Sequence, residues 1–381
     1  MLNVMRAVTM VMGLLIAAPC VGQTPTPRPP IQWRVDFTGF YEYDTNPLRF
    51  SLGSGDSHWR LFPSVDVQAP LNARTTLFGR STLRRDQYGA TSLLNGIGLN
   101  GSVGVARRVA PRVSVWGAYD VSRSEQPDVL EGSPSRFASY TQQGGSAGLI
   151  WRTRRTDVLR ADGFAARRQY RGLSSPLLPA LSSQVDPVLG LGASWTHTFG
   201  EHAETWSRIA LNTTWHRSNN PAYSYTLPSA SVAWGTNLRA ESTLRLDATL
   251  AWLNYDARRV GLSSVLRRDT IADVGATVAW HRDRRVEPFV RFSKQWDRST
   301  DPLRTFADSR VLVGARISVG AGGQRRANND RRPLTSDINE DAAPKGVGLG
   351  GTHALLHQFI ARRSIFCAGE TRVRAITARS W

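Results

Sequence analysis

The sequence contains almost no lysine, although it is strongly basic. Lys294 and Lys345 are the only lysines, so the formal net charge of +18 comes almost wholly from arginine. A chain this basic raises the question of nucleic-acid binding. The arginines are spread through the whole sequence instead of gathering on one helix or arm, so we expect no nucleic-acid partner.

Cysteine and long apolar runs are also scarce. The first 22 residues predict a signal peptide, with Arg6 ahead of an apolar stretch at 8–18 and the small residues Cys20 and Gly22 before the cleavage point. Its removal would leave Cys367 as the only thiol, which excludes an intramolecular disulfide. Beyond residue 22 no apolar run approaches the roughly 20 residues that a membrane helix needs, so membrane insertion would require strands.

Motifs for catalysis and cofactor binding are missing. The chain has no CxxC, no HExxH, no P-loop and no glycine-rich dinucleotide turn. His197, His216 and His281 fall on different predicted strands, near different ends. We therefore expect no enzymatic activity, no metal and no cofactor.

What the sequence does contain is regular alternation of apolar and polar residues. Apolar side chains occupy even positions in 270–280 and 286–292, and odd positions in 311–319. A period of two over about ten residues predicts a strand with one face toward lipid and the other toward a polar lumen. The rest of the chain repeats this unit.

This alternation predicts an all-β fold, a transmembrane antiparallel up-and-down β-barrel of about 14 strands. Residues 23–31 form a proline-rich periplasmic lead-in, 32–319 the barrel, and 320–381 a Gly/Arg-rich tail that is disordered or spurious. Short connections alternate with longer ones rich in Gly, Pro and Ser, as periplasmic turns and external loops do in outer-membrane barrels. The expected strands are 32–43, 57–68, 75–85, 95–107, 112–124, 137–151, 156–168, 187–198, 204–217, 225–235, 242–255, 269–281, 286–296 and 306–319.

Tryptophan and tyrosine support the same fold because they share the apolar face of each predicted strand. They form two groups, which we interpret as aromatic girdles at the two membrane interfaces. The group predicted near the periplasmic end is Trp33, Trp151, Trp195, Trp234 and Trp280; the group near the outer end is Tyr41, Trp59, Tyr119, Trp215 and Trp252.

The opposite face of the strands is polar and is expected to line the lumen. There, mixed charges can pair across strands, hold water or attract a solute. Arginine outnumbers the acids on this predicted face, which favours a mild preference for anions. The candidate lumen residues are Arg34, Arg60, Asp66, Arg80, Arg160, Asp162, Arg208, Arg245, Asp247, Glu287, Arg291, Arg310 and Arg316.

Three short segments resemble a known family. Residues 40–47 (FYEYDTNP), 60–65 (RLFPSV) and 267–270 (RRDT) resemble elements of outer-membrane β-barrel porins associated with exopolysaccharide export. The resemblance covers roughly 32–319 and implies an export channel. The barrel domain of surface lipoprotein assembly modifiers is similar as well, but those proteins usually carry a helical-repeat domain in front of the barrel.

Three functions are compatible with these features. The first is a porin-like channel for passage or export of a solute or polysaccharide, mildly anion-preferring. The others are a translocation or assembly platform for surface (lipo)proteins, and a plugged structural or adhesive barrel. In each case we expect the bacterial outer membrane as the location, and outer-membrane lipid and the barrel assembly machinery as partners. An anionic solute or polysaccharide is the expected cargo of a channel.

Overall fold

The computed structural model describes residues 31–47, 55–90, 95–125, 128–130, 133–135, 140–170, 185–200, 205–219, 221, 224–239, 241, 242–260, 263–280 and 285–321. The predicted signal peptide, the lead-in up to residue 30, His281 and the tail beyond 321 lie outside these residues. No helix within them is long and apolar enough to cross a bilayer.

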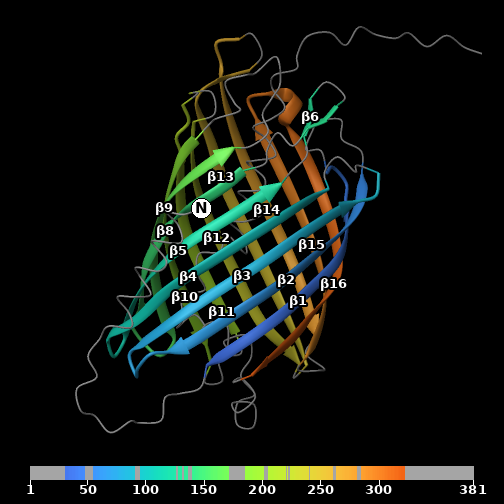
Figure 1. Cartoon of the computed structure of the whole chain (residues 1–381). Helices are drawn as coiled ribbons and strands as arrows, with labels where there is room; N and C mark the ends of the chain where they lie inside the picture. The colour runs from blue at the N-terminus through green and yellow to red at the C-terminus, as the bar shows by residue number, and fades with distance from the viewer. Residues whose placement is uncertain are drawn as a thin grey trace, which may run out of the picture. The chain divides into compact units, whose positions relative to one another are not determined.

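Fourteen antiparallel strands close into a barrel, in which β1 pairs with β16 as well as with β2. Figure 1 shows blue β1 beside orange β16 at this closure. The strands are β1 (Gln32–Asp44), β2 (Asp56–Pro70), β3 (Thr75–Tyr88), β4 (Gly96–Ala110), β5 (Val113–Glu125), β8 (Tyr140–Arg152), β9 (Asp157–Tyr170), β10 (Val185–Phe199), β11 (Thr205–His216), β12 (Tyr225–Arg239), β13 (Ser242–Arg259), β14 (Leu266–Trp280), β15 (Val286–Ser299) and β16 (Phe306–Ala321).

The predicted fold class and number of barrel strands are therefore confirmed. The sequence did not predict the small separate hairpin of β6 (Asp128–Leu130) and β7 (Ser133–Ser135), or the short 3-10 helix η4 (Pro302–Arg304). Both lie in long connections. The connections at one end of the barrel are short, such as 111–112 and 240–241, and those at the other are longer, such as 126–139 and 171–184. We call these the short-turn end and the long-loop end.

Directly opposed residues climb steadily around the barrel. Followed from pair to pair, Trp33 near the short-turn end of β1 is aligned through ten intervening strands with Arg268, near the long-loop end of β14. A closed barrel requires such a stagger because its strands tilt relative to the axis. On each successive strand, the residue at a given height therefore lies on the short-turn side of the directly opposed residue.

The outer wall carries the apolar face of every strand. Its exposed side chains include Phe37, Leu191, Leu211, Val232 and Val313, which a soluble protein would bury. All of the predicted girdle aromatics lie on this wall, since they share its strand parity. Tyr119 lies halfway along β5, however, and not near an end. Trp296 is exposed on the outer wall near the long-loop end of β15 and was not predicted, because the expected strand ended at that residue.

Candidate functional site: the barrel lumen

The inward face carries the charged residues, and every predicted lumen residue lies on it. These side chains come from β1, β2, β3, β9, β11, β13, β15 and β16. Most of them meet a carboxylate or guanidinium on the same or an adjacent strand. The charges fall into two zones that differ in exposure.

In the short-turn half most of the charged side chains remain accessible to water, although those of Asp36 and Asp247 are only 10% and 7% exposed. Arg34 Nε lies 2.9 Å from Asp36 Oδ2, and Arg80 Nε lies 3.3 Å from Asp66 Oδ1. The side chains of Arg245 and Arg316 are 48% and 47% exposed. We call this zone the vestibule and assign to it Arg34, Asp36, Asp66, Arg80, Arg160, Asp162, Arg208, Arg245, Asp247, Glu287, Arg291 and Arg316. Two further acids, Asp120 on β5 and Asp273 on β14, face inward near the middle of their strands.

The vestibule pair with the most hydrogen bonds joins Arg291 and Asp247. Both terminal nitrogens of Arg291 donate to Asp247 oxygens at 2.7 Å, and Nη1 also donates to Thr277 Oγ1 at 3.1 Å. The pair crosses Gly275 on the strand between them, where a Cβ would collide with the guanidinium. Bidentate geometry holds the Arg291 side chain against the wall. Arg245, 3.7 Å from the same carboxylate, is the more exposed cation of the two.

In the long-loop half the charges are buried. Asp86 forms ion pairs with Arg60 and with Arg84, whose Nε lies 3.0 Å from the carboxylate. All three side chains are almost inaccessible to solvent. Arg310 Nε lies 2.7 Å from Asp308 and 4.0 Å from Asp44. We call this zone the charged layer; it comprises Glu42, Asp44, His58, Arg60, Arg84, Asp86, Arg168, Asp186, His216, Arg267, Asp269, Asp297, Asp308 and Arg310.

Two stacked histidines belong to the charged layer on opposite walls. The ring of His58 stacks on Tyr88 at 4.2 Å, and that of His216 stacks on Tyr225 at 4.8 Å with Asp186 3.0 Å from Nε2. Their strands, β2 and β11, are separated by six strands on either side. The layer therefore has members on opposite sides of the barrel.

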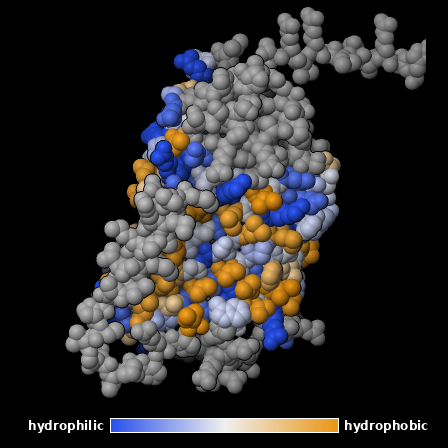
Figure 2. Space-filling model, viewed as in Figure 1, coloured by the Kyte–Doolittle hydropathy of each residue, from blue (hydrophilic) through white to orange (hydrophobic). Residues whose placement is uncertain are grey.

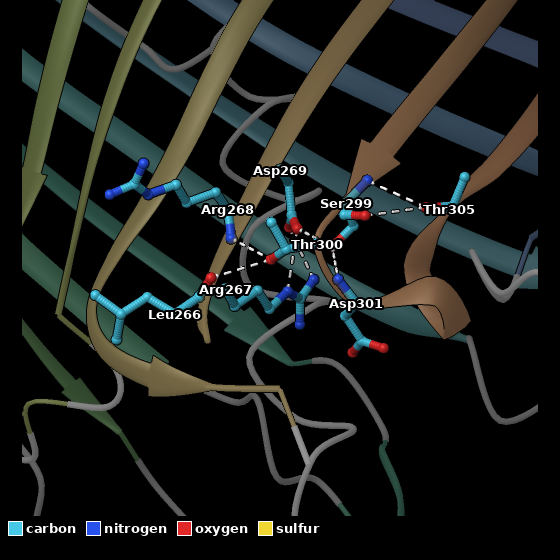
Figure 3. Close-up of polar contacts among 8 residues, drawn as sticks. All are labelled: Leu266, Arg267, Arg268, Asp269, Ser299, Thr300, Asp301 and Thr305. Carbon is cyan, nitrogen blue, oxygen red and sulfur yellow. Dashed lines mark hydrogen bonds and ion pairs between the residues drawn. The ribbon is translucent and has the colours of Figure 1, made fainter. Parts of the chain in front are cut away.

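Figure 3 shows one part of the layer where β14 meets β15. Arg267 Nη2 donates to Asp269 Oδ2 at 2.8 Å, and Ser299 Oγ donates to the same carboxylate. Ser299 Oγ in turn accepts the backbone N–H of Asp301 at 3.0 Å, and Thr300 Oγ1 donates to the Leu266 carbonyl at 3.1 Å. These bonds tie the connection before η4 to the charged layer. The RRDT segment (267–270) thus takes part in a hydrogen-bond network at the long-loop end, which the spacing of residues in the sequence did not predict.

Five inward-facing aromatics line the wall below the charged layer, each directly opposite a glycine. A Cβ at Gly148 would lie 2.6 Å from Trp116 Nε1, and one at Gly235 would lie 2.6 Å from Trp206 Cε2. A ring that covers a glycine on the next strand lies flat against the sheet instead of projecting across the lumen. The opposed pairs are Phe78–Gly104, Trp116–Gly148, Phe164–Gly190, Trp206–Gly235 and Phe289–Gly314.

The charge balance of the inward face differs from the sequence expectation. Among the buried residues of the charged layer, acids outnumber arginines, because Asp44, Asp86, Asp186 and Asp297 add to Glu42, Asp269 and Asp308. The arginine excess is confined to the exposed side chains of the vestibule. Any electrostatic preference for anions must therefore arise in the vestibule, since the acids above it are buried among arginines.

The histidines considered as catalytic candidates do not meet. His197 lies on the outer wall, 2.9 Å from Asp157, whereas His216 lies inside beside Asp186. Within the described ranges, no group of three or more His, Cys, Asp and Glu side chains could hold a metal ion.

Comparison with known proteins gives fold-level likenesses. No family model and no curated protein matches the chain in sequence. The Pseudomonas putida toluene transporter TodX is 11% identical with a TM-score of 0.44, over 77% of this chain and 90% of that one. An anion-selective porin from Comamonas acidovorans is 9% identical with a TM-score of 0.42, over 76% and 99%. OmpT in its trimer form, an outer-membrane protein of Vibrio cholerae, is 8% identical with a TM-score of 0.46, over 76% of this chain and 99% of that one.

At these scores the likenesses carry no argument about activity. The barrel is closed, its outer wall is apolar and its interior is charged. These features are the basis of the function proposed below.

Proposed function

We propose that the chain is a channel of the bacterial outer membrane, with the short-turn end in the periplasm. The observation that carries this proposal is a closed barrel whose exterior is apolar and whose interior is lined by ion pairs. Outer-membrane lipid would contact the outer wall, and the barrel assembly machinery would insert the chain. A solute or a polysaccharide would pass through the lumen.

The vestibule supports a mild preference for anions. Arg245 and Arg316 are about half exposed, whereas the Glu287 side chain that pairs with Arg316 at 3.7 Å is 26% exposed. Accessible positive side chains attract anions to the mouth of a pore. An anionic solute or anionic polysaccharide, as the resemblance to export porins implies, is therefore the cargo that we propose.

The test is single-channel conductance of the signal-free, refolded chain in a planar bilayer with a salt gradient. Discrete steps with a reversal potential that favours anions would support the channel. The alternative is a plugged structural or adhesive barrel, which the buried charged layer favours. A barrel that circular dichroism shows to be folded but that never conducts would support this alternative.

Replacing both Arg245 and Arg316 with glutamine should reduce the anion preference of the open channel. A unit charge about 4 Å from an ion in water changes its energy by about 1 kcal/mol, so the permeability ratio of chloride to potassium should fall severalfold. The control is Arg107→Gln, which removes an exposed arginine near the same end but on the outer wall. An equal fall in both proteins would contradict a role of the vestibule in ion preference.

A further inference from the structure

Four side chains on the outer wall, toward the short-turn end, lie in one row across neighbouring strands. Asp157 on β9 is directly opposite His197 on β10, and His197 is directly opposite Ser207 on β11. Ser207 is in turn directly opposite Trp234 on β12. All four have the outward parity of their strands. A carboxylate, an imidazole, a hydroxyl and an indole N–H therefore follow one another along the wall, outside the lumen.

Asp157 holds the ring of His197 in one orientation. Asp157 Oδ1 lies 2.9 Å from His197 Nδ1 and also accepts the indole N–H of Trp195 at 2.9 Å. Its other oxygen accepts the hydroxyl of Thr156 at 2.9 Å. A neutral His197 that donates to this fixed carboxylate from Nδ1 carries its lone pair on Nε2. The aspartate of a Ser-His-Asp triad orients its histidine in the same way.

Ser207 lies on the opposite side of His197 from Asp157, as a nucleophile requires. Directly opposed side chains have Cβ atoms about 4.5–5.5 Å apart, so the hydroxyl reaches Nε2 when it turns toward the ring. Such hydrogen bonds commonly tighten only when substrate binds. The His197 side chain is 28% exposed, so the pair is accessible from outside the barrel. Trp234 adds a hydrogen-bond donor beside the hydroxyl.

The surroundings of the row change from polar to apolar over a few residues. Two residues nearer the short-turn end, the hydroxyl oxygens of Thr205 and Thr236 lie 2.8 Å apart. Two residues nearer the middle of the wall, Ile209 and Leu159 are 47% and 37% exposed. On the wall that faces the viewer in Figure 2, a band of mostly hydrophobic residues likewise gives way to hydrophilic ones. The row thus fits the boundary between hydrocarbon and headgroups, the depth at which the acyl esters of a lipid lie.

We propose that Ser207, His197 and Asp157 form a site that hydrolyses acyl esters of glycerophospholipids in the periplasmic leaflet. Ser207 Oγ attacks the ester carbonyl carbon, and His197 Nε2 takes the hydroxyl proton. The bond from that carbon to the glycerol oxygen breaks, and Nε2 gives the proton to the leaving alcohol. Water then attacks the acyl-serine through the same histidine, which releases a fatty acid and restores the hydroxyl. Trp234 donates to the carbonyl oxygen as it becomes negative, and Asp157 is a positioning residue.

The sequence motifs indicated no enzyme because only strand register brings these three residues together. The hydrolytic activity is additional to the proposed channel. It rests on the proposed membrane location and orientation, but not on conduction.

The test is hydrolysis of dioleoyl phosphatidylethanolamine by the refolded barrel in mixed detergent micelles, followed as release of oleate. Ser207→Ala should lower the rate at least about a hundredfold, because the nucleophile is lost. A fluorophosphonate probe should label the parent, and mass spectrometry of its peptides should place the label on Ser207. The matched control is Ser81→Ala, which removes an exposed serine of the outer wall that lies opposite Val65 and Gly101 instead of a histidine. Its rate and labelling should equal those of the parent.

The role of Asp157 has a readout separate from activity. Nitrogen NMR of histidine-labelled protein should show the proton of neutral His197 on Nδ1, with His197→Gln identifying its signals. Asp157→Asn should lose this tautomer preference together with most of the hydrolysis, because the carboxylate no longer accepts from the ring.

Three results would overturn the site: no oleate released by the folded parent, a probe label on another residue, or a rate that Ser207→Ala leaves unchanged. Conductance is not used. A silent barrel that releases oleate would refute the channel and leave this site standing, and a conducting barrel that releases none would do the reverse.

Discussion

Replacing Asp86 with asparagine is expected to lower the free energy of unfolding by about 3 kcal/mol, because breaking a buried ion pair leaves an uncompensated buried charge. The Asp86 side chain is 1% exposed and neutralises both Arg60 and Arg84. Asparagine keeps the shape but not the charge. The measurement is urea unfolding of the refolded barrel in detergent, followed by tryptophan fluorescence.

The control for this substitution is Glu287→Gln in the vestibule. Its partner, Arg316, is about half exposed, so solvent already screens the pair, and we expect a loss of less than about 1 kcal/mol. If both variants unfold alike, the charged layer does not stabilise the long-loop half.

In planar bilayers, the Asp86→Asn channel should also open more often than the parent channel if the charged layer obstructs the pore.

The second large effect is expected at Gly235. A valine there would meet three atoms of Trp206 at 2.6–2.8 Å and force the ring off the wall. Overpacking of this kind costs about 1–3 kcal/mol, so we expect Gly235→Val to lose about 2 kcal/mol in the same unfolding assay. Gly101→Val is the control, since a Cβ added there meets nothing within 4 Å.

A double-mutant cycle distinguishes this collision from a general intolerance of valine. In a Trp206→Ala background the ring is gone, so Gly235→Val should cost little beyond the loss caused by Trp206→Ala itself. The coupling energy between the two positions should then be about 2 kcal/mol, within the range for residues in contact. Additive losses would mean that the ring does not cover the glycine.

Most of the barrel could be predicted from the sequence because period-two alternation directly encodes which face of a strand is apolar. Trp33, Trp195 and Trp280 are on the outer wall because their parity required it. By the same alternation, Arg34, Asp247 and Arg291 were placed on the inward face. Strand pairing followed as well, since sequential strands joined by alternating short and long connections form neighbours in an up-and-down barrel.

The charged layer was largely missed because it is built from strand ends. The predicted strands stopped at 43, 85 and 296, and one began at 187, so Asp44, Asp86, Asp297 and Asp186 each fell one residue outside. Aspartate is depleted in strands and common in turns, which made these positions resemble loops. The true strands continue through them, and the expected excess of arginine on the inward face disappears.

Contacts between strands could not be predicted for a different reason. Periodicity assigns a residue to a face but gives no register, and a shift of the register changes every partner. The pairing of Arg60 with Asp86, and of Trp206 with Gly235, depends on register alone. No signal in the sequence distinguished these pairs from other arginines and glycines of the same parity.

The opposition of aromatics and glycines also bears on how such a barrel could have grown. In each of the five pairs, the ring lies on an outward-running strand and the glycine on the strand that follows it in the barrel. Each of these hairpins thus contains both the aromatic ring and the glycine opposite it. Duplicating or deleting a hairpin would leave every remaining ring with its glycine, so the circumference could change during evolution without rebuilding the inner wall.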